Sequence, residues 1–205
     1  MEKTIKHLKK QHKNKSSEIK KRLNEFEKTG KKNIEELFVE LCYCLCTPLS
    51  KAERVIQVIT SQNKNVLLKK GQKELENLLI RHVRFHKNKS RYIIEARRAL
   101  KNLKRLSKNP DEARDFLVEN IKGLSFKEAS HFLRNIGYKG LAIIDGHILN
   151  CLKEHGVLKS NKRPKNKKEY LEIENKIKGF AKKVKIPVDE LDLLFWSNKT
   201  GKVLK

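Results

Sequence analysis

Apolar residues recur along this chain at intervals of three and four positions, which is the spacing of one face of an α-helix. Four stretches show this most clearly: residues 19–26, 37–45, 93–103 and 170–184. No window alternates between apolar and polar residues over several positions, as a half-buried strand does. The pattern therefore predicts an all-α fold built from many short helices.

Several helix starts are marked by residues that cap the N-terminus. Ser50 stands three positions before Glu53, and Ser125 stands three positions before Glu128, so both pairs match a capping box. Asn109 is followed directly by proline, which is favoured in the first helical turn. We therefore expect one helix to begin directly after each of these three cap residues.

The charge of the chain is strongly unbalanced. There are 49 Lys and Arg residues against 24 Asp and Glu residues, a formal net charge of +25. The surplus lies in several segments, among them residues 1–32 and 159–185, so we expect a basic face rather than one basic tail. This surplus of positive charge predicts a polyanionic partner, for which nucleic acid is the first candidate and a membrane surface the second. The alternative is a solvated, lysine-rich surface of the kind found in heat-adapted proteins.

The four cysteines are Cys42, Cys44, Cys46 and Cys151. Because no two of them form a Cys-x-x-Cys pair, we expect no zinc site and interpret them as small buried hydrophobic side chains. The chain has no apolar run long enough for a transmembrane helix, and none follows its first charged residues. These features predict a cytoplasmic protein with no membrane partner, disulfide, metal or other cofactor.

Residues 112–137 predict a helix, a short hairpin and a second helix. Gly123 supplies a turn conformation that is closed to other residues. Ser125 caps the second helix, whose first backbone N–H groups point outward from the hairpin. Such a hairpin binds a DNA phosphate through backbone N–H groups without reading the base sequence. We therefore predict a helix–hairpin–helix motif that places Gly123 and Ser125 at the DNA backbone.

Two residues near this motif are candidates for chemistry. Lys127 falls in the first turn of the second helix, where the helix dipole disfavours an ammonium group, although Glu128 opposes this effect. A lysine that is neutral part of the time is a nucleophile, whereas most lysines of this chain are expected to be surface charges. Asp145 ends an apolar run and precedes a predicted helix over residues 146–155. It is either the N-cap of that helix or a carboxylate at the mouth of a cleft, and the two roles are compatible.

Lys127 and Asp145 are joined by a helix, a glycine-rich turn and an apolar run that ends in Asp-Gly-His. This arrangement resembles the helix–hairpin–helix, Gly/Pro…Asp superfamily of DNA glycosylases. Three strings narrow the resemblance to the small archaeal-type 8-oxoguanine DNA glycosylase/AP lyases: Lys-Glu-Ala-Ser-His-Phe-Leu-Arg-Asn-Ile-Gly-Tyr at 127–138, Val-Arg-Phe at 83–85 followed by Asn-Lys-Ser-Arg-Tyr-Ile at 88–93, and the Phe-Trp…Lys ending. The resemblance runs from about residue 30 to the last residue. The endonuclease III branch, with its iron–sulfur cluster, is excluded because no cysteine follows Cys151.

The resemblance implies a function and a mechanism. Lys127 would attack C1′ of the sugar, displace 8-oxoguanine and form a Schiff base that permits β-elimination at the 3′ phosphate. Asp145 would stabilise the positive charge that develops on the sugar and help to orient or activate the amine. Trp196 would stack on the oxidised base, and the terminal residue Lys205 would reach the pocket, where a carboxylate or carbonyl accepts the N7–H of the lesion. His131 shares a helix face with Lys127 and is either a wall of the base pocket or a buried, hydrogen-bonded histidine.

Arg84 and Phe85 are candidates for the group that enters the duplex when a base leaves the stack. The alternative is a core phenylalanine beside a surface arginine. The partner implied by the resemblance is double-stranded DNA that contains oxidised guanine, bound by a monomer.

We expect one domain over residues 1–205, with two helical lobes flanking a DNA-binding cleft. Residues 1–30 would form a basic N-terminal helix or arm. Residues 159–168 lack apolar side chains and are expected to be a linker before the last helices. Residues 188–205 would close the pocket.

Three other functions remain open at this point. A non-catalytic helix–hairpin–helix protein would explain the charge and the hairpin, but not a lysine, an aspartate and a tryptophan in these positions. An RNA-binding or ribosome-associated protein would explain the charge alone. A glycosylase of the same superfamily could also act on another oxidised or alkylated base.

Overall fold

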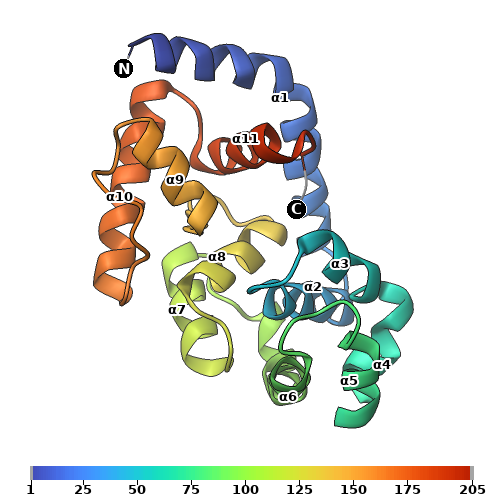
Figure 1. Ribbon diagram of the computed structural model, residues 1–205. Helices are drawn as coiled ribbons and strands as arrows, with labels where there is room; N and C mark the ends of the chain where they lie inside the picture. Colours follow the sequence, from blue (N-terminus) through green and yellow to red (C-terminus); the bar gives the residue numbers. More distant parts are fainter. Residues whose placement is uncertain (1, 204–205) are drawn as a thin grey trace. The chain divides into compact units, whose positions relative to one another are not determined.

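The computed structural model describes residues 2–203, and the side chains of residues 5–203. Every regular element of this part of the chain is helical (Figure 1). The all-α prediction is therefore confirmed, and most helices are short, as the apolar pattern indicates.

The helices belong to two compact units. The terminal unit combines both ends of the chain, Met1–Glu27 and Gly137–Lys205, and the central unit is Lys28–Ile136. The terminal unit contains most of α1 (Glu2–Gly30), together with α9 (Gly146–Glu154), α10 (Lys167–Val184) and α11 (Val188–Thr200). The central unit contains α2 (Ile34–Cys46), α3 (Ala52–Val58), η1 (Ser61–Asn63), α4 (Lys64–Lys69), α5 (Gln72–Leu79), α6 (His86–Ala96), η2 (Arg97–Lys104), α7 (Pro110–Asn120) and α8 (Phe126–Asn135).

The core of the central unit is built around α2, in which every residue from 37 to 46 is buried. A helix that is apolar on all sides is stable only when other helices surround it, and α2 packs against α4, α6, η2 and α8. Cys42, Cys44 and Cys46 are buried inside this core and do not form disulfides. Burial raises the pKa of the Cys46 thiol to about 12. These three cysteines are therefore buried packing residues, as predicted.

In the terminal unit, α1 buries an apolar stripe and forms polar contacts with the last part of the chain. Leu8, Ile19 and Phe26 are buried along one side of α1. On the same side of α1, the guanidinium of Arg22 donates to the carbonyl oxygen of Val203 at 3.1 Å. Of the two forms expected for residues 1–30, the described residues adopt the helix.

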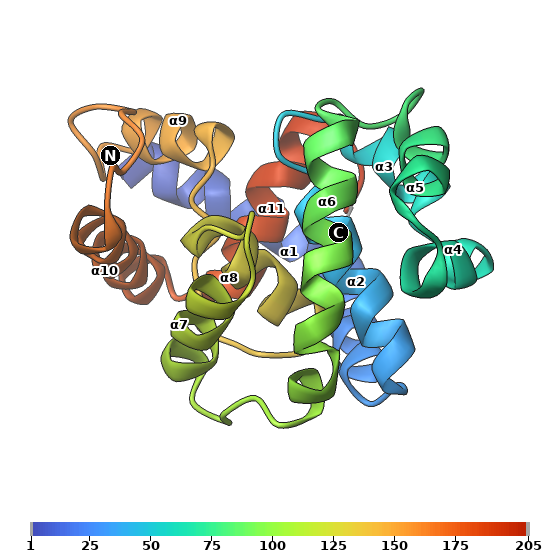
Figure 2. The same cartoon turned by 90° about the horizontal axis from the view of Figure 1, so that it is seen from below.

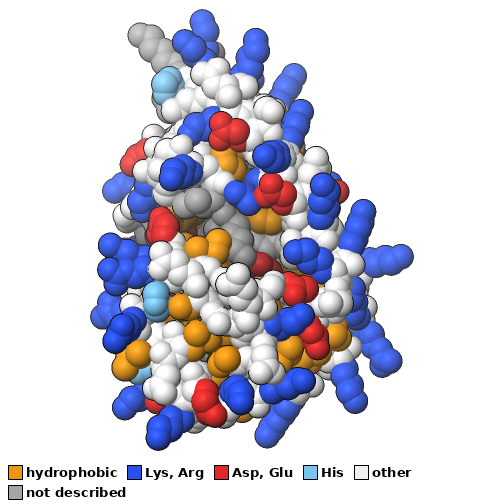
Figure 3. Space-filling view, turned by 90° about the vertical axis from the view of Figure 1, so that its right-hand side faces the viewer, with side chains coloured by type: hydrophobic (Ala, Val, Ile, Leu, Met, Phe, Trp, Pro, Cys, Tyr) orange, Lys and Arg blue, Asp and Glu red, His pale blue; other side chains and the backbone are white. Residues whose placement is uncertain are grey.

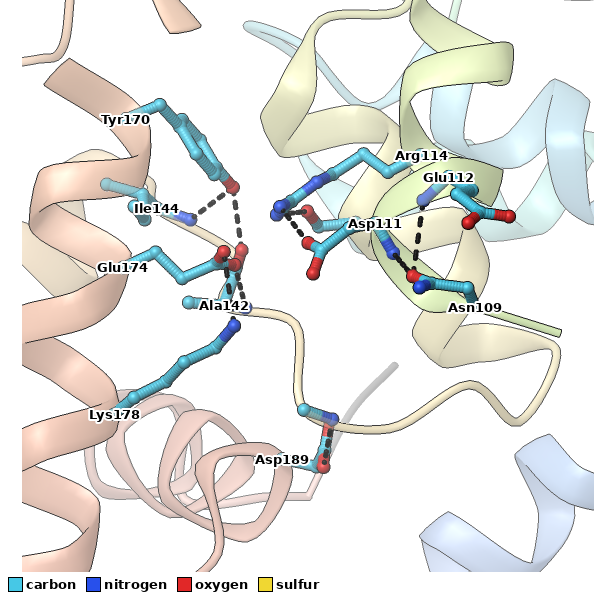
Figure 4. A network of polar contacts seen from close by, with 12 residues as sticks. Asn109, Asp111, Glu112, Arg114, Ala142, Ile144, Tyr170, Glu174, Lys178 and Asp189 are labelled. Carbon is cyan, nitrogen blue, oxygen red and sulfur yellow. Dashed lines mark hydrogen bonds and ion pairs between the residues drawn. The ribbon is translucent and has the colours of Figure 1, made fainter. Parts of the chain in front are cut away.

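The helix starts that depend on Asn109 and Ser125 are confirmed. The Asn109 side chain accepts the backbone N–H groups of Asp111 and Glu112 at the start of α7 (Figure 4). Ser125 and Glu128 form a complete capping box at the start of α8, which lies alongside α7 (Figure 2).

Two local expectations are wrong. The helix α3 begins at Ala52 with Lys51 as its N-cap, and Ser50 does not cap it. The Ser50 hydroxyl instead accepts the backbone N–H of Arg84, 34 positions away, at 2.9 Å. Residues 159–168 do not separate two parts of the fold, because α9 and α10 on either side of them belong to the same unit.

Candidate functional site

The hairpin between α7 and α8 is shaped by a glycine. Gly123 has a φ of 91°, a conformation that disfavours residues with a side chain. A Cβ atom at this position would also lie 2.5 Å from the aromatic ring of Tyr92, which is too close. Both the backbone conformation and the contact with α6 therefore require glycine. Gly123 and Ser125 lie where the sequence predicts them, in the hairpin and at the start of α8.

Lys127 is held in the first turn of α8 by its neighbour. Its ammonium donates to Oε1 of Glu128 at 3.0 Å, and its side chain is 23% exposed. The other oxygen of Glu128, Oε2, accepts from the backbone N–H and the hydroxyl of Ser125. Burial alone would raise the pKa of Glu128, but the charge of Lys127 and these hydrogen bonds keep that pKa below its ordinary value. The ionised Glu128 therefore fixes the position of an amine that still reaches the surface.

A second lysine, Lys89, lies inside the central unit and was not singled out by the sequence. Its ammonium donates to the carbonyl oxygens of Cys46 at 2.8 Å and Pro48 at 2.6 Å, and to the hydroxyl of Ser50 at 3.0 Å. Burial, together with the positive charge of Lys127, lowers the pKa of Lys89 to about 8. The burial of Lys89 could have been predicted from the sequence, since position 89 falls on the same face of α6 as the apolar residues at 93 and 96.

This lysine makes the stability of the protein depend on pH. The pKa of Lys89 is about 8 in the folded protein against 10.5 ordinarily, so between these values the unfolded chain binds more protons. The free energy of unfolding therefore rises with pH in this window. A Lys89→Met variant lacks this contribution. We expect the stability of the wild type, relative to the variant, to increase by up to roughly 3 kcal/mol from pH 8 to 10.5.

Urea unfolding at several pH values measures this difference. The exposed residue Lys87 provides the control, because a Lys87→Met variant should keep the pH dependence of the wild type. Parallel curves for the wild type and Lys89→Met would contradict the prediction.

In the terminal unit, Asp145 starts α9. Its Oδ1 accepts the backbone N–H of Ile148 at 2.8 Å, so the predicted N-cap is confirmed. The segment before it is anchored by two side chains of α10 (Figure 4). Tyr170 donates its hydroxyl to the carbonyl oxygen of Ala142 at 2.6 Å, and Glu174 accepts the N–H of Ala142 at 2.9 Å. Asp145 therefore lies between a segment that is anchored to α10 and the first turn of α9.

His147 connects Asp145 with the last helix. It is the second residue of α9, and its Nε2 donates to the carbonyl oxygen of Phe195 in α11 at 2.9 Å. Its ring lies edge-on to that of Trp196, with 5.0 Å between the ring centres. The ammonium of Lys199 lies 5.1 Å from the centre of the Trp196 ring. The terminal unit therefore brings Asp145, His147 and Trp196 together, although the sequence did not assign a role to His147.

The remaining candidates lie in different surroundings. His131 is buried, and its ring packs edge-on to that of Tyr43 at 5.8 Å. Phe85 is 50% exposed, so the alternative of a core phenylalanine is wrong. The guanidinium of Arg84 lies 5.1 Å from the centre of its ring. Lys205 lies outside the described residues.

Lys127 and Asp145 belong to different units of the chain, Lys127 to the central unit and Asp145 to the terminal unit. Each stands at the start of its own helix with its side chain held by local hydrogen bonds. Their joint action on one substrate stays a prediction.

The family model described as 8-oxoguanine DNA glycosylase matches residues 19–186, most of the chain. The chain belongs to the 8-oxoguanine DNA glycosylase family. The family predicted from the resemblance is thereby confirmed.

Known 8-oxoguanine DNA glycosylases match this chain over nearly their whole length. The 8-oxoguanine DNA glycosylase/AP lyase of Methanocaldococcus jannaschii is 43% identical over 200 residues, which cover 93% of this chain and 95% of the relative. The crystal structure of the 8-oxoguanine DNA glycosylase of Thermotoga maritima matches with a TM-score of 0.93 and 34% identity, over all of both chains. The Methanocaldococcus jannaschii enzyme in complex with a 15mer DNA containing 8-oxoguanine matches with a TM-score of 0.91 and 38% identity, over 98% of this chain and 99% of the other.

Relatives of this chain are named 8-oxoguanine DNA glycosylase/AP lyase. The prediction that the family combines glycosylase and lyase activity is therefore confirmed. Two other features of this family member bear on its partners. Within residues 2–203, no helix is both long and apolar enough to cross a membrane. Lys and Arg side chains cover much of the face drawn in Figure 3, with fewer acidic side chains between them.

Proposed function

We propose that this protein removes 8-oxoguanine from double-stranded DNA and then cleaves the strand at the abasic site. The observation that carries this proposal is the family match over residues 19–186, together with a half-buried lysine directly behind the hairpin. The relative whose crystal structure contains DNA with 8-oxoguanine supports the choice of lesion. The net charge of +25 supports a polyanionic partner.

In the proposed mechanism, the ammonium of Lys127 first gives up a proton to the solvent, and the resulting neutral amine attacks C1′ of the flipped nucleotide. The bond between C1′ and the base breaks, and the base leaves with the bonding electrons and takes up a proton. Opening of the sugar ring then yields a Schiff base between Lys127 and C1′. Loss of a proton from C2′ allows the bond from C3′ to the phosphate oxygen to break, which is β-elimination. Glu128 keeps the amine in place for the first step.

Asp145 supplies negative charge during base loss. Positive charge develops on the sugar as the bond to the base lengthens, and a carboxylate held in a fixed position stabilises that charge without having to reorganise. The bond from Ile148 N–H to one carboxylate oxygen supports such a fixed orientation. Trp196 stacks on the oxidised base, with His147 and Phe195 holding the end of α11 at the start of α9.

The remaining roles follow the resemblance. Lys205 reaches the pocket, where its carboxylate or carbonyl accepts the N7–H of the lesion, and His131 forms a wall of the base pocket. Gly123 and Ser125 bind the phosphate backbone, and Arg84 and Phe85 occupy the space that the flipped base leaves. The chain acts as one domain and as a monomer, with residues 188–205 closing the pocket.

Borohydride trapping tests the proposal, because borohydride reduces a Schiff base to a stable covalent adduct. With wild-type protein we expect an adduct on a duplex that contains 8-oxoguanine and none on the undamaged duplex. Duplexes with other oxidised or alkylated bases measure the specificity for the lesion. Equal binding of damaged and undamaged duplexes without any adduct would contradict the lyase mechanism and favour a non-catalytic DNA-binding protein.

A further inference from the structure

Residues 140–145 form the segment that leads into α9 and ends at Asp145. The four apolar side chains at positions 141–144 are buried, but the segment belongs to no helix or strand. Buried backbone N–H and C=O groups need hydrogen-bond partners, and regular secondary structure does not supply them here. The conformation of the segment before Asp145 therefore depends on side chains from other parts of the chain.

Three buried side chains from α10 and α11 supply these partners (Figure 4). Asp189, in the first turn of α11, accepts the N–H of Gly140 at 3.0 Å. Glu174, in α10, accepts the N–H of Ala142 at 2.9 Å. The hydroxyl of Tyr170, also in α10, donates to the carbonyl oxygen of Ala142 at 2.6 Å. The segment is therefore fixed to two helices of its own unit.

Tyr170 also holds the residue directly before Asp145. Its hydroxyl accepts the N–H of Ile144 at 3.4 Å, so one oxygen atom connects Ala142 with Ile144. Only 4% of Tyr170 is exposed, and water therefore does not compete for these hydrogen bonds. The chain is thus fixed on the side from which it enters Asp145.

The exact position of Asp145 matters because its proposed contribution to base loss is electrostatic. A charge that is already in place stabilises a developing opposite charge without having to reorganise, and this advantage is lost when the charged group is free to move. A displacement of about 1 Å can reduce the rate of an enzyme by about 10²-fold. The N–H of Ile148 holds Asp145 from the side of α9, which leaves the other side to the segment that Tyr170 holds.

We propose that Tyr170 is a positioning residue for base excision, because its hydroxyl holds the chain at Ala142 and Ile144 so that the carboxylate of Asp145 faces the sugar. The inference rests on the proposed function, since Asp145 acts on a sugar only if the protein excises a base. Tyr170 touches no reacting atom, and it changes the rate only through Asp145.

A double-mutant cycle tests whether Tyr170 acts through Asp145. Tyr170→Phe keeps the aromatic ring and removes only the hydroxyl. In the otherwise wild-type chain it should slow single-turnover excision of 8-oxoguanine about tenfold, while the affinity for the damaged duplex stays within about twofold. In an Asp145→Asn background, the same change should slow the remaining excision by less than about twofold, because the charge that it would misplace is already absent.

Val184→Ala is the control that separates positioning from a loss of stability. Val184 is buried at the last residue of α10, and its truncation leaves a cavity in the same unit. Both Val184→Ala and Tyr170→Phe should unfold at a lower temperature than the wild type. Only Tyr170→Phe should excise more slowly at a temperature at which all the variants are folded.

The rates of these variants decide between the possible outcomes. A tenfold loss in both backgrounds would show that Tyr170 acts independently of Asp145 and would overturn the positioning role, as would a wild-type rate for Tyr170→Phe or an equal loss in Val184→Ala. If the wild type excises 8-oxoguanine and Asp145→Asn does so equally fast, the inference alone is wrong, because Asp145 then supplies no charge that needs positioning. If the wild type does not excise 8-oxoguanine, the proposed function is wrong and the inference fails with it.

Discussion

Replacing Lys127 with glutamine is expected to abolish the borohydride-trapped adduct and to reduce strand cleavage by roughly 10⁴-fold or more. Glutamine has no amine that can attack C1′, so neither the Schiff base nor the elimination that follows from it can form. The side chain keeps a similar length. The capping box between Ser125 and Glu128 does not involve the Lys127 side chain, so α8 should keep its start. The loss should therefore reflect chemistry rather than folding.

The hairpin offers a matched control for this variant. Lys122 lies five positions before Lys127 with a side chain that is 67% exposed and an ion pair to Glu95 at 3.7 Å. Exposed ion pairs contribute little to stability, so Lys122→Gln should fold normally and still form the adduct. Trapping of Lys127→Gln at the wild-type level, in gel assays that resolve the covalent complex, would show that another amine is the nucleophile.

Replacing Asp145 with asparagine should slow base excision by roughly 10²- to 10³-fold while leaving the fold intact. Asparagine keeps an oxygen that accepts the N–H of Ile148, and it is as good an N-cap as aspartate. It lacks the negative charge that stabilises the sugar in the transition state. The substitution therefore separates the two roles that the sequence predicts for this residue.

Single-turnover excision and thermal unfolding, measured on the same samples, distinguish these roles. An Asp145→Ala variant loses both charge and cap, so its stability should fall by about 1 kcal/mol, in addition to the loss of rate. The affinity of Asp145→Asn for the damaged duplex should stay within a few-fold of the wild type. If Asp145→Asn excises at the normal rate, the residue is only a helix cap.

Much of the helical framework was predictable because its signals are local. The three–four spacing over residues 170–184 predicts α10, which runs from Lys167 to Val184. Asn109, Ser125 and Asp145 each cap a helix through a backbone group two or three positions later in the chain. These interactions involve only a few consecutive residues, so they do not depend on how the rest of the chain folds.

The same local reasoning failed for Ser50, which has the spacing of a capping box but does not cap a helix. Its hydroxyl is taken by the backbone of Arg84 and the ammonium of Lys89, 34 and 39 positions further along. A side chain has few hydrogen-bonding positions, and distant partners compete for them with the nearby backbone. The apparent linker over residues 159–168 failed in a similar way, because polarity alone does not tell whether flanking helices fold together.

The sequence by itself determined the all-α class, the hairpin with Gly123, and the helix starts that carry Lys127 and Asp145, because each depends on neighbours within one or two turns. Only the tertiary structure decided that Lys89 is buried and Leu49 exposed. Burial depends on which segments meet, and here α6 meets the chain that follows α2, about forty positions earlier. Lysine side chains are usually exposed and leucine side chains usually buried. Long-range packing reversed both, because a buried ammonium is stable where three oxygens accept its hydrogen bonds.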